Sequence, residues 1–192
     1  MCAYQCPVTN FAKHRLGMGN LYQTLSVKGK WQKSNPIIKK TIPAALVPYI
    51  LDSGSLTKSL IALSDNNFQV NVLEQKIALP FFDEQIKLGQ ALYRSAVIRQ
   101  VELKIYSEAV VYARSIIPTT LFNKRNNGLA SLGKTPLGHL LFQKSQCVES
   151  KREYKRTRIN NDDYYARRSP YHYSGEDILV TEYFLPSLNK YL

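Results

Sequence analysis

The sequence predicts an α+β fold built around an antiparallel sheet. Strand-like segments come in pairs separated by very short breaks, which is typical of hairpins, and helix-like segments cluster elsewhere instead of alternating with the strands. The composition is close to the globular average, with 44% hydrophobic and 21% charged residues. A chain of 192 residues is therefore long enough for one domain to bury its own core without metal or disulfide crosslinks.

Two helices are predicted near the start of this domain. Residues 1–35 are polar and mixed, so we expect a loosely ordered N-terminal extension ahead of a single domain over residues 36–192. Over residues 43–64, apolar side chains recur at helical spacing on both sides of a short break. Ser53 and Ser55 lie in that break and are candidate N-caps of the second helix.

Six later segments have the alternation or the apolar content of strands. The two longest β-rich runs are separated only at Ser107, so we expect them to form a hairpin. Asn160 and Asn161 predict a tight turn between two further strands. The six segments are residues 66–73, 95–106, 108–117, 151–159, 162–173 and 175–186.

The chain is strongly basic, with 26 lysines and arginines against 14 acidic residues and a net charge of +12. This surplus is compatible with nucleic acid, an anionic membrane surface or a small anionic substrate, and charge alone does not choose among them. No apolar run is long enough to span a bilayer, and the N-terminus lacks the apolar core of a secretory signal, so we expect a reducing compartment such as the cytoplasm. We expect neither a disulfide framework nor a metal site, because the candidate ligands are few and scattered: Cys2, Cys6, Cys147, His14, His139 and His172.

Glu182 is the first candidate for chemistry. Alternation along the last predicted strand places it on the same face as Val180 and Phe184. A carboxylate on an apolar face is costly unless it is paired or hydrogen-bonded, and its desolvation would suit it to proton transfer. The alternative is a glutamate that faces solvent at a sheet edge, or one held in a structural ion pair.

Arg99 is the second candidate, because it shares a strand face with Val101 and Leu103. A guanidinium directed at a core face requires an anion, and its forked geometry fits a carboxylate. That anion is either a ligand or simply Glu182. Arg114 is a weaker candidate, because both faces of its strand are mixed and a solvated arginine is the default there.

The string Gly-Lys-Thr-Pro-Leu-Gly is the third feature. Together with Gly128 it matches the P-loop pattern formally, but no hydrophobic strand precedes it and the sheet is not of the βαβ type. A better account uses Thr135 as an N-cap with Pro136 at the first helical position, which leaves the backbone amides near Leu137 as a small anion site. The helix start after Ser55 offers a second such site, and the alternative for both is a capped helix that binds only water.

Basic residues interleave with tyrosines between Lys151 and Tyr173. Such a run can neutralise RNA and stack on its bases. Tyrosines on strands, however, commonly pack half-buried with charged residues outward, and acidic residues interrupt this run. We therefore expect no nucleic-acid partner. The tyrosines are Tyr154, Tyr164, Tyr165, Tyr171 and Tyr173.

These strings together resemble the chorismate lyase (chorismate–pyruvate lyase) family, in order and spacing, over most of the chain. The most specific blocks are Leu-Gly-Lys-Thr-Pro-Leu-Gly with the following Leu-Phe, and Thr-Glu-Tyr-Phe-Leu-Pro near the C-terminus. The content of Lys, Asn and Tyr is similar to that of the cyanobacterial and algal-plastid branch. The blocks are residues 52–58, 97–103, 113–118, 132–142, 167–169 and 179–186.

The resemblance implies a six-stranded antiparallel sheet with helical flaps over a buried site. It also implies a monomeric, cofactor-free enzyme that converts chorismate to 4-hydroxybenzoate and pyruvate for plastoquinone or ubiquinone ring synthesis, in the cytoplasm or the plastid stroma. The family's site arginine falls on Arg99, its site carboxylate on Glu182, its two backbone amide contacts on Leu56 and Leu137, and a second arginine on Arg114.

These residue types suit the implied reaction. Chorismate is a dianion, so Arg99 and the two amides can hold a carboxylate, while Glu182 can bind the C4 hydroxyl and orient it or accept a proton. Arg114 would stabilise charge on the departing enolpyruvyl group. The alternative is a non-catalytic sensor of small aromatic acids, because the same fold occurs in the effector-binding domains of some transcription regulators. The complete pair of Arg99 and Glu182, and the lack of a helix-turn-helix in this sequence, favour the enzyme.

Overall fold

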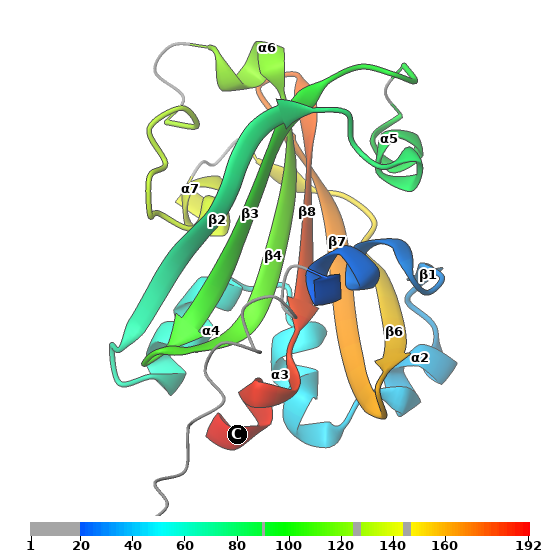
Figure 1. Ribbon diagram of the computed structural model, residues 1–192, viewed down its shortest axis with the longest axis vertical. Coiled ribbons are helices and arrows are strands. Elements are labelled where there is room, and N and C mark those ends of the chain that lie inside the picture. The colour runs from blue at the N-terminus through cyan, green and yellow to red at the C-terminus, as the bar shows by residue number, and fades with distance from the viewer. Residues whose placement is uncertain (1–19, 90, 125–127, 144–146) are drawn as a thin grey trace, which may run out of the picture.

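The computed structural model describes residues 20–89, 91–124, 128–143 and 147–192. Its framework is one antiparallel sheet with helices on both faces (Figure 1). Among the described residues, the strands follow the order β1–β6–β7–β8–β4–β3–β2, and β5 pairs with β7 outside that path. The α+β class expected from the sequence is confirmed.

The element bounds agree well with the predicted segments. No helix in the described part of the chain is long and apolar enough to cross a membrane. The helices are one over residues 20–27, then α2 Pro36–Thr41, η1 Ala44–Leu46, α3 Val47–Ile50, α4 Leu56–Leu63, α5 Phe82–Leu88, α6 Thr119–Phe122, α7 Leu137–Gln143 and η2 Pro186–Tyr191. The strands are β1 Gln32–Lys33, β2 Phe68–Ala78, β3 Ala96–Ile105, β4 Glu108–Pro118, β5 Val148–Glu149, β6 Glu153–Ile159, β7 Asp162–Tyr173 and β8 Glu176–Phe184.

The described sheet has eight strands, whereas the family resemblance implied six. The six longer strands, β2, β3, β4, β6, β7 and β8, are those that the sequence predicted. The additional strands β1 and β5 have two residues each and pair with β6 and β7. Two residues are too few to show alternation, so their strand character depends on the neighbour they meet.

The predicted hairpins are confirmed. Strands β3 and β4 pair across the turn at Tyr106 and Ser107, and Tyr106 has a positive φ of 54°. Asn160 and Asn161 join β6 to β7 with φ values of 49° and 70°, as the two central residues of a type I′ turn require. Strand β2 is longer than the sequence predicted, with a register shift between Val72 and Glu74.

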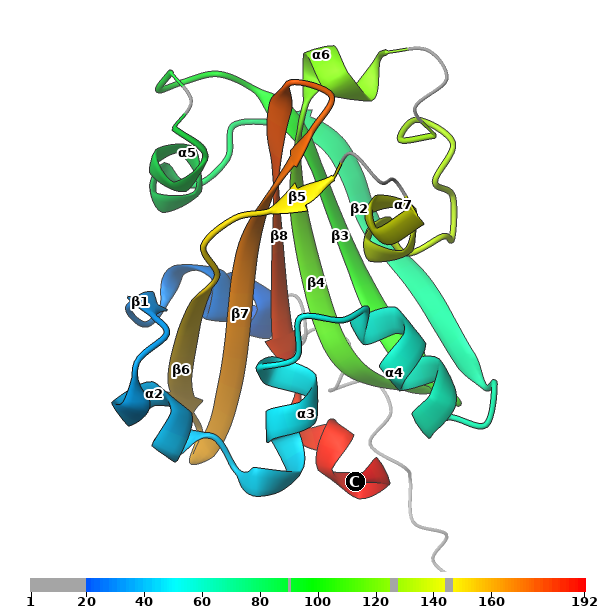
Figure 2. The ribbon, with the colours of Figure 1, turned by 180° about the vertical axis from the view of Figure 1, so that it is seen from behind.

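Different helices cover the two faces of the sheet. Helices α3, α4 and α7 lie across one face, which Figure 2 shows from the front. There Leu56 and Leu60 of α4 belong to one buried cluster, and Leu137 and Leu141 of α7 belong to a second. The helix over residues 20–27 covers the opposite face (Figure 1), so each face has its own core. We call the two sides the flap face and the N-helix face.

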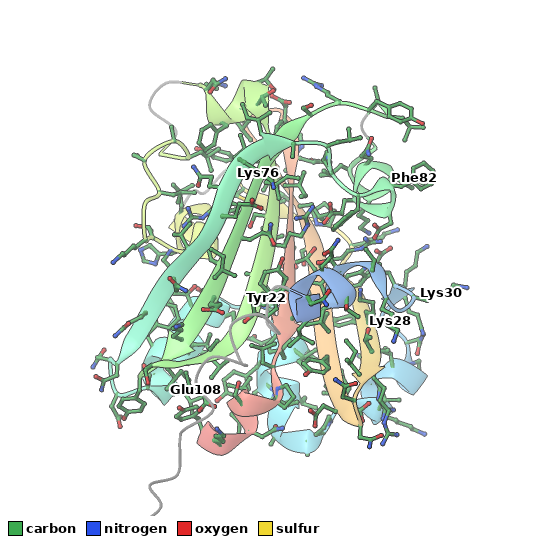
Figure 3. The ribbon with its side chains drawn as sticks, viewed as in Figure 1. Tyr22, Lys28, Lys30, Lys76, Phe82 and Glu108 are labelled. Carbon is green, nitrogen blue, oxygen red and sulfur yellow. The ribbon has the colours of Figure 1, made fainter. Side chains whose placement is uncertain are left out.

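The helix over residues 20–27 lies in the segment expected to be a loose extension. The Tyr22 ring stacks on Tyr112 with 4.2 Å between centroids, and its hydroxyl donates to Glu102 at 2.8 Å. Leu25 is completely buried. Figure 3 shows Tyr22 in front of the sheet on the N-helix face. The described part of this segment therefore adds to the core of the domain.

The tyrosines of the basic run are packed into the core. All five are less than a tenth exposed: Tyr154, Tyr164, Tyr165, Tyr171 and Tyr173. The hydroxyl of Tyr165 donates to the carbonyl of Thr41 at 2.8 Å. Rings held in this way do not offer the open faces on which bases stack.

Lys155 is an unusual member of the N-helix face, because it is only 2% exposed. Its Nζ donates to the carbonyl of Leu25 at 2.7 Å and lies 4.6 Å from the ring centroid of Trp31. A second ring, that of Tyr183, lies 5.2 Å from the ammonium. Burial lowers the pKa of Lys155 to about 8. The charge is thus held by a carbonyl and aromatic faces at a considerable desolvation cost.

We expect the stability of the protein to rise with pH relative to a Lys155→Met variant. Below a pH of about 8, Lys155 is protonated in the folded and unfolded states, so the burial cost is present in full. At higher pH the folded state loses this proton first, and the difference in unfolding free energy should change by about 2 kcal/mol between about pH 7 and about pH 9.5. Urea unfolding of both proteins measures this difference. The ionisation of the nearby tyrosines contributes to both unfolding free energies and therefore cancels in the comparison. A difference independent of pH would contradict the assignment.

Candidate active site

A small cavity lies between the flap face and the starts of α4 and α7. Its floor includes Ala113 and Ser115 of β4, whose small side chains leave a hollow in the middle of the sheet. Its roof includes Leu56 and Leu137, the first residues of the two helices. The cavity encloses about 40 Å³. A cavity that binds benzene measures about 150 Å³, so the roof or the lining side chains must move before a ring can enter.

Arg99 of β3 lies in this cavity and is 3% exposed. Its Nη1 donates to Oε1 of Gln75 at 2.9 Å, and its Nη2 donates to the carbonyls of Gly133 and Thr135 at 2.8 and 3.3 Å. All three acceptors are neutral. Burial lowers the pKa of Arg99, but an arginine remains protonated at neutral pH. The cavity thus contains a buried cation that forms no ion pair with a carboxylate of the described residues.

Glu182 of β8 also lines the cavity, and its partner is Arg167 of β7. Nε of Arg167 donates to Oε2 of Glu182 at 2.5 Å, and the two residues face each other in the β7–β8 register. The structural ion pair considered for Glu182 is therefore present, but its cation is not Arg99. Arg99 and Glu182 lie on strands separated by β4 and are offset by two residues along it, so their Cα positions are about 12 Å apart.

The structure does not bring Arg114 into this cavity. Because Ala113 and Ser115 face the flap side, alternation turns Arg114 to the N-helix face. There it donates to both oxygens of Glu84, at 2.7 and 3.1 Å, and lies 4.4 Å from the centroid of the Phe81 ring. Burial alone would lower the pKa of Arg114, but the Glu84 carboxylate raises it overall. Arg114, expected as a site residue, therefore pairs with Glu84 on the face opposite the cavity.

The two helix starts expected at the site are present. Ser55 caps α4 by accepting from the backbone N–H of Lys58 at 3.5 Å, which confirms that N-cap. Helix α7 begins at Leu137, one residue later than the sequence predicted. All pairings among the described strands are antiparallel, so Gly128 does not follow a parallel strand as a P-loop requires.

Arg167 is the site residue that sequence reasoning missed. It is 3% exposed and lines the cavity, yet its neighbour Arg168 occupies the other face of the sheet. Two adjacent arginines on one strand always face opposite sides, and only the register with β8 decides which one meets Glu182. The alternation of Tyr165, Arg167, Ser169 and Tyr171 was the available signal.

The fold and the cavity define an α+β protein with a buried, net cationic pocket. Comparisons with known proteins assign its family. Residues 25–191 match the family model described as chorismate lyase. A "Probable chorismate pyruvate-lyase" from Methylococcus capsulatus is 32% identical over 152 residues, covering 73% of this chain and 94% of the relative. One from Aromatoleum aromaticum is 33% identical over 174 residues, covering 82% and 92%. The chain therefore belongs to the chorismate lyase family, a family of carbon–oxygen lyases.

Solved structures with a similar backbone are more distant. A GntR-family transcriptional regulator from Bacillus cereus gives a TM-score of 0.49 at 12% identity, covering 63% of this chain and 93% of the regulator. A possible transcriptional regulator from Bacillus subtilis gives 0.49 at 9% identity, covering 94% and 96%.

We expect Arg114→Met to lower the unfolding free energy by about 3–5 kcal/mol, because it leaves the buried Glu84 carboxylate without its cation. A double variant, Arg114→Met with Glu84→Gln, should be more stable than the single variant, since no charge is then left unpaired. Denaturant unfolding of both variants measures the two losses. A single variant as stable as the double variant would contradict the pairing.

Proposed function

We propose that the protein converts chorismate to 4-hydroxybenzoate and pyruvate. The observation that carries this proposal is the cavity, which combines an unpaired buried arginine, two helix starts and one carboxylate. Family membership supports the same reaction, because the relatives are named as probable chorismate pyruvate-lyases. The product 4-hydroxybenzoate would serve as a ring precursor for quinone synthesis.

Arg99 is the proposed anchor for a substrate carboxylate. The other charged side chains of the cavity, Arg167 and Glu182, already neutralise each other. An incoming carboxylate would therefore meet the uncompensated guanidinium of Arg99 and the backbone amides at Leu56 and Leu137. These contacts form in a buried site, where they are stronger than the same contacts in water.

Glu182 is the proposed base. In the reaction the C4–H bond breaks, its electron pair forms the new ring double bond, and the C3–O bond breaks to release enolpyruvate. Enolpyruvate then takes up a proton at carbon to become pyruvate, and formation of the aromatic ring supplies the driving force. Arg167 occupies Oε2 of Glu182, which leaves Oε1 to face the C4 hydroxyl or the C4 proton.

The closed roof has a consequence for the catalytic cycle. Chorismate and 4-hydroxybenzoate are both larger than the enclosed space, so the roof or the lining side chains must move at entry and again at release. A roof that closes again over the enlarged, occupied cavity would exclude water from the reacting ring.

We expect the purified protein to form pyruvate and 4-hydroxybenzoate in equal amounts from chorismate, as measured by chromatography. Glu182→Gln keeps the shape of the side chain but removes the base, so kcat should fall by about 100-fold or more. Near-normal turnover in this variant would exclude Glu182 as the base. Tight binding of 4-hydroxybenzoate by the wild type without any turnover would instead identify a sensor of small aromatic acids.

We expect Arg99→Gln to weaken the binding of 4-hydroxybenzoate by about 10- to 100-fold, because a charge-assisted contact with its carboxylate is lost. Titration calorimetry measures the affinity directly. Thermal unfolding of the same variant, with and without the ligand, separates a loss of affinity from a loss of folded protein. Unchanged affinity would exclude Arg99 as the carboxylate anchor.

A further inference from the structure

We propose that Arg167 is a positioning residue of this site: one guanidinium orients Glu182 and fixes the connection between α3 and α4 above the cavity. The inference rests on the proposed function, because it assigns Arg167 a role in that reaction. It does not require Arg167 to touch the substrate.

The guanidinium group of Arg167 makes two sets of contacts, one from each of two edges. Nε donates to Oε2 of Glu182 at 2.5 Å. Nη1 donates to the carbonyl of Tyr49 at 2.9 Å and to that of Asp52 at 2.9 Å, with Ile50 further away at 3.5 Å. Because Nε and Nη1 lie on different edges of the planar group, the same side chain makes both sets of contacts at once.

The carbonyls that Arg167 holds belong to the end of α3 and the connection after it. The last carbonyls of a helix have no partner within the helix, so a buried donor there stabilises the helix end. The chain then passes directly into α4, whose residues Leu56 and Thr57 form part of the cavity roof. The position of this half of the roof is thus tied to the arginine that holds Glu182.

A second arginine reinforces the same connection. Nη1 of Arg152 donates to the carbonyl of Asp52 at 2.5 Å. Arg152 is in turn held by Glu149, which also accepts from the hydroxyl of Ser169 on β7. The carbonyl of Asp52 therefore joins the roof to β7 through two guanidinium groups, and one of these, Arg167, also forms the ion pair with Glu182.

The two cavity arginines have different partners, and this separates their roles. Within the described part of the chain, Arg99 donates only to neutral groups and remains available for a substrate anion. The charge of Arg167 is already matched by Glu182. A side chain committed to a carboxylate on one edge and to the backbone on the other is suited to fixing geometry rather than to binding a second anion.

Arg168 provides a matched control. It is the next residue on β7, is 6% exposed and donates to Glu153 at 2.8 Å and to Asp83 at 2.7 Å. These contacts lie on the N-helix face, away from the cavity. Removal of Arg168 breaks two ion pairs where removal of Arg167 breaks one, so it is a stringent control that leaves Glu182 and the roof unaltered.

The test compares Arg167→Gln, Arg167→Lys and Arg168→Gln in the chorismate assay, with kcat expressed per folded molecule. We expect Arg167→Gln to lower kcat by about 100-fold while KM changes by less than about threefold, because a misplaced base slows the chemical step. Arg167→Lys should recover about tenfold, since an ammonium can keep Glu182 but cannot reach the backbone carbonyls as well. Arg168→Gln should leave kcat within about twofold.

Hydrogen exchange provides a readout that does not need turnover. In Arg167→Gln, the backbone amides of residues 51–57 should exchange faster than in the wild type, and in Arg168→Gln they should not. This measurement also reports on Arg167→Lys if the glutamine variant fails to fold.

The outcomes separate the two proposals. If the wild type is active and Arg167→Gln has an unchanged kcat, the inference is overturned and the proposed function stands. The same holds for Arg167→Lys if only that variant folds. An inactive wild type overturns both. A rise in KM at constant kcat would show that Arg167 binds substrate directly. Equal losses of kcat in Arg167→Gln and Arg168→Gln would show a general structural role. Each of these results overturns the positioning role.

Discussion

The alternation of side chains across the antiparallel sheet is the constraint on which the rest of this structure depends. Consecutive residues face opposite cores, so each buried charge must find a partner on the face that alternation assigns to it. Among the described residues, four arginines are buried. Arg114 and Arg168 meet carboxylates on the N-helix face, and Arg167 meets Glu182 on the flap face. Arg99 alone is satisfied only by neutral acceptors. Of these four arginines, Arg99 is therefore the one whose charge no carboxylate of the described residues matches, and it lines the cavity.

The cavity itself follows from side-chain size in the central strand. Ala113 and Ser115 place small side chains between Arg99 on β3 and Glu182 on β8, so the floor is hollow where larger residues would fill it. The starts of α4 and α7 close the hollow from above, and the first backbone N–H groups of a helix have no partner within the helix. On the N-helix face the same strand presents Tyr112 and Arg114, which pack against Tyr22 and Glu84.

The structural features that the sequence predicted correctly are those specified by residues close together in the chain. The hairpins depend on alternation and on turns such as Asn160–Asn161, and the start of α4 depends on the cap at Ser55, so short stretches specify them. The two-residue strands β1 and β5 depend on distant neighbours and have no local signature. Arg99 lines the cavity as the sequence suggested, whereas the partners of Arg114 and Arg167 depend on segments distant in sequence. Arg114 was assigned to the site although its strand neighbours occupy the cavity face, and Arg167 was missed because its contact with Glu182 depends on the β7–β8 register.

Both cavity arginines also hold the roof, and this links ligand binding to roof position. Arg99 donates to the carbonyls of Gly133 and Thr135, just ahead of α7, whereas Arg167 donates to carbonyls ahead of α4. A substrate carboxylate would compete with the two α7-side carbonyls for the donors of Arg99, because a charged acceptor forms the stronger hydrogen bond. No such competition arises at Arg167, whose charge is already matched. Ligand binding should accordingly shift the α7 half of the roof more than the α4 half, since a ligand moves only the equilibria in which it interacts differently with the two states.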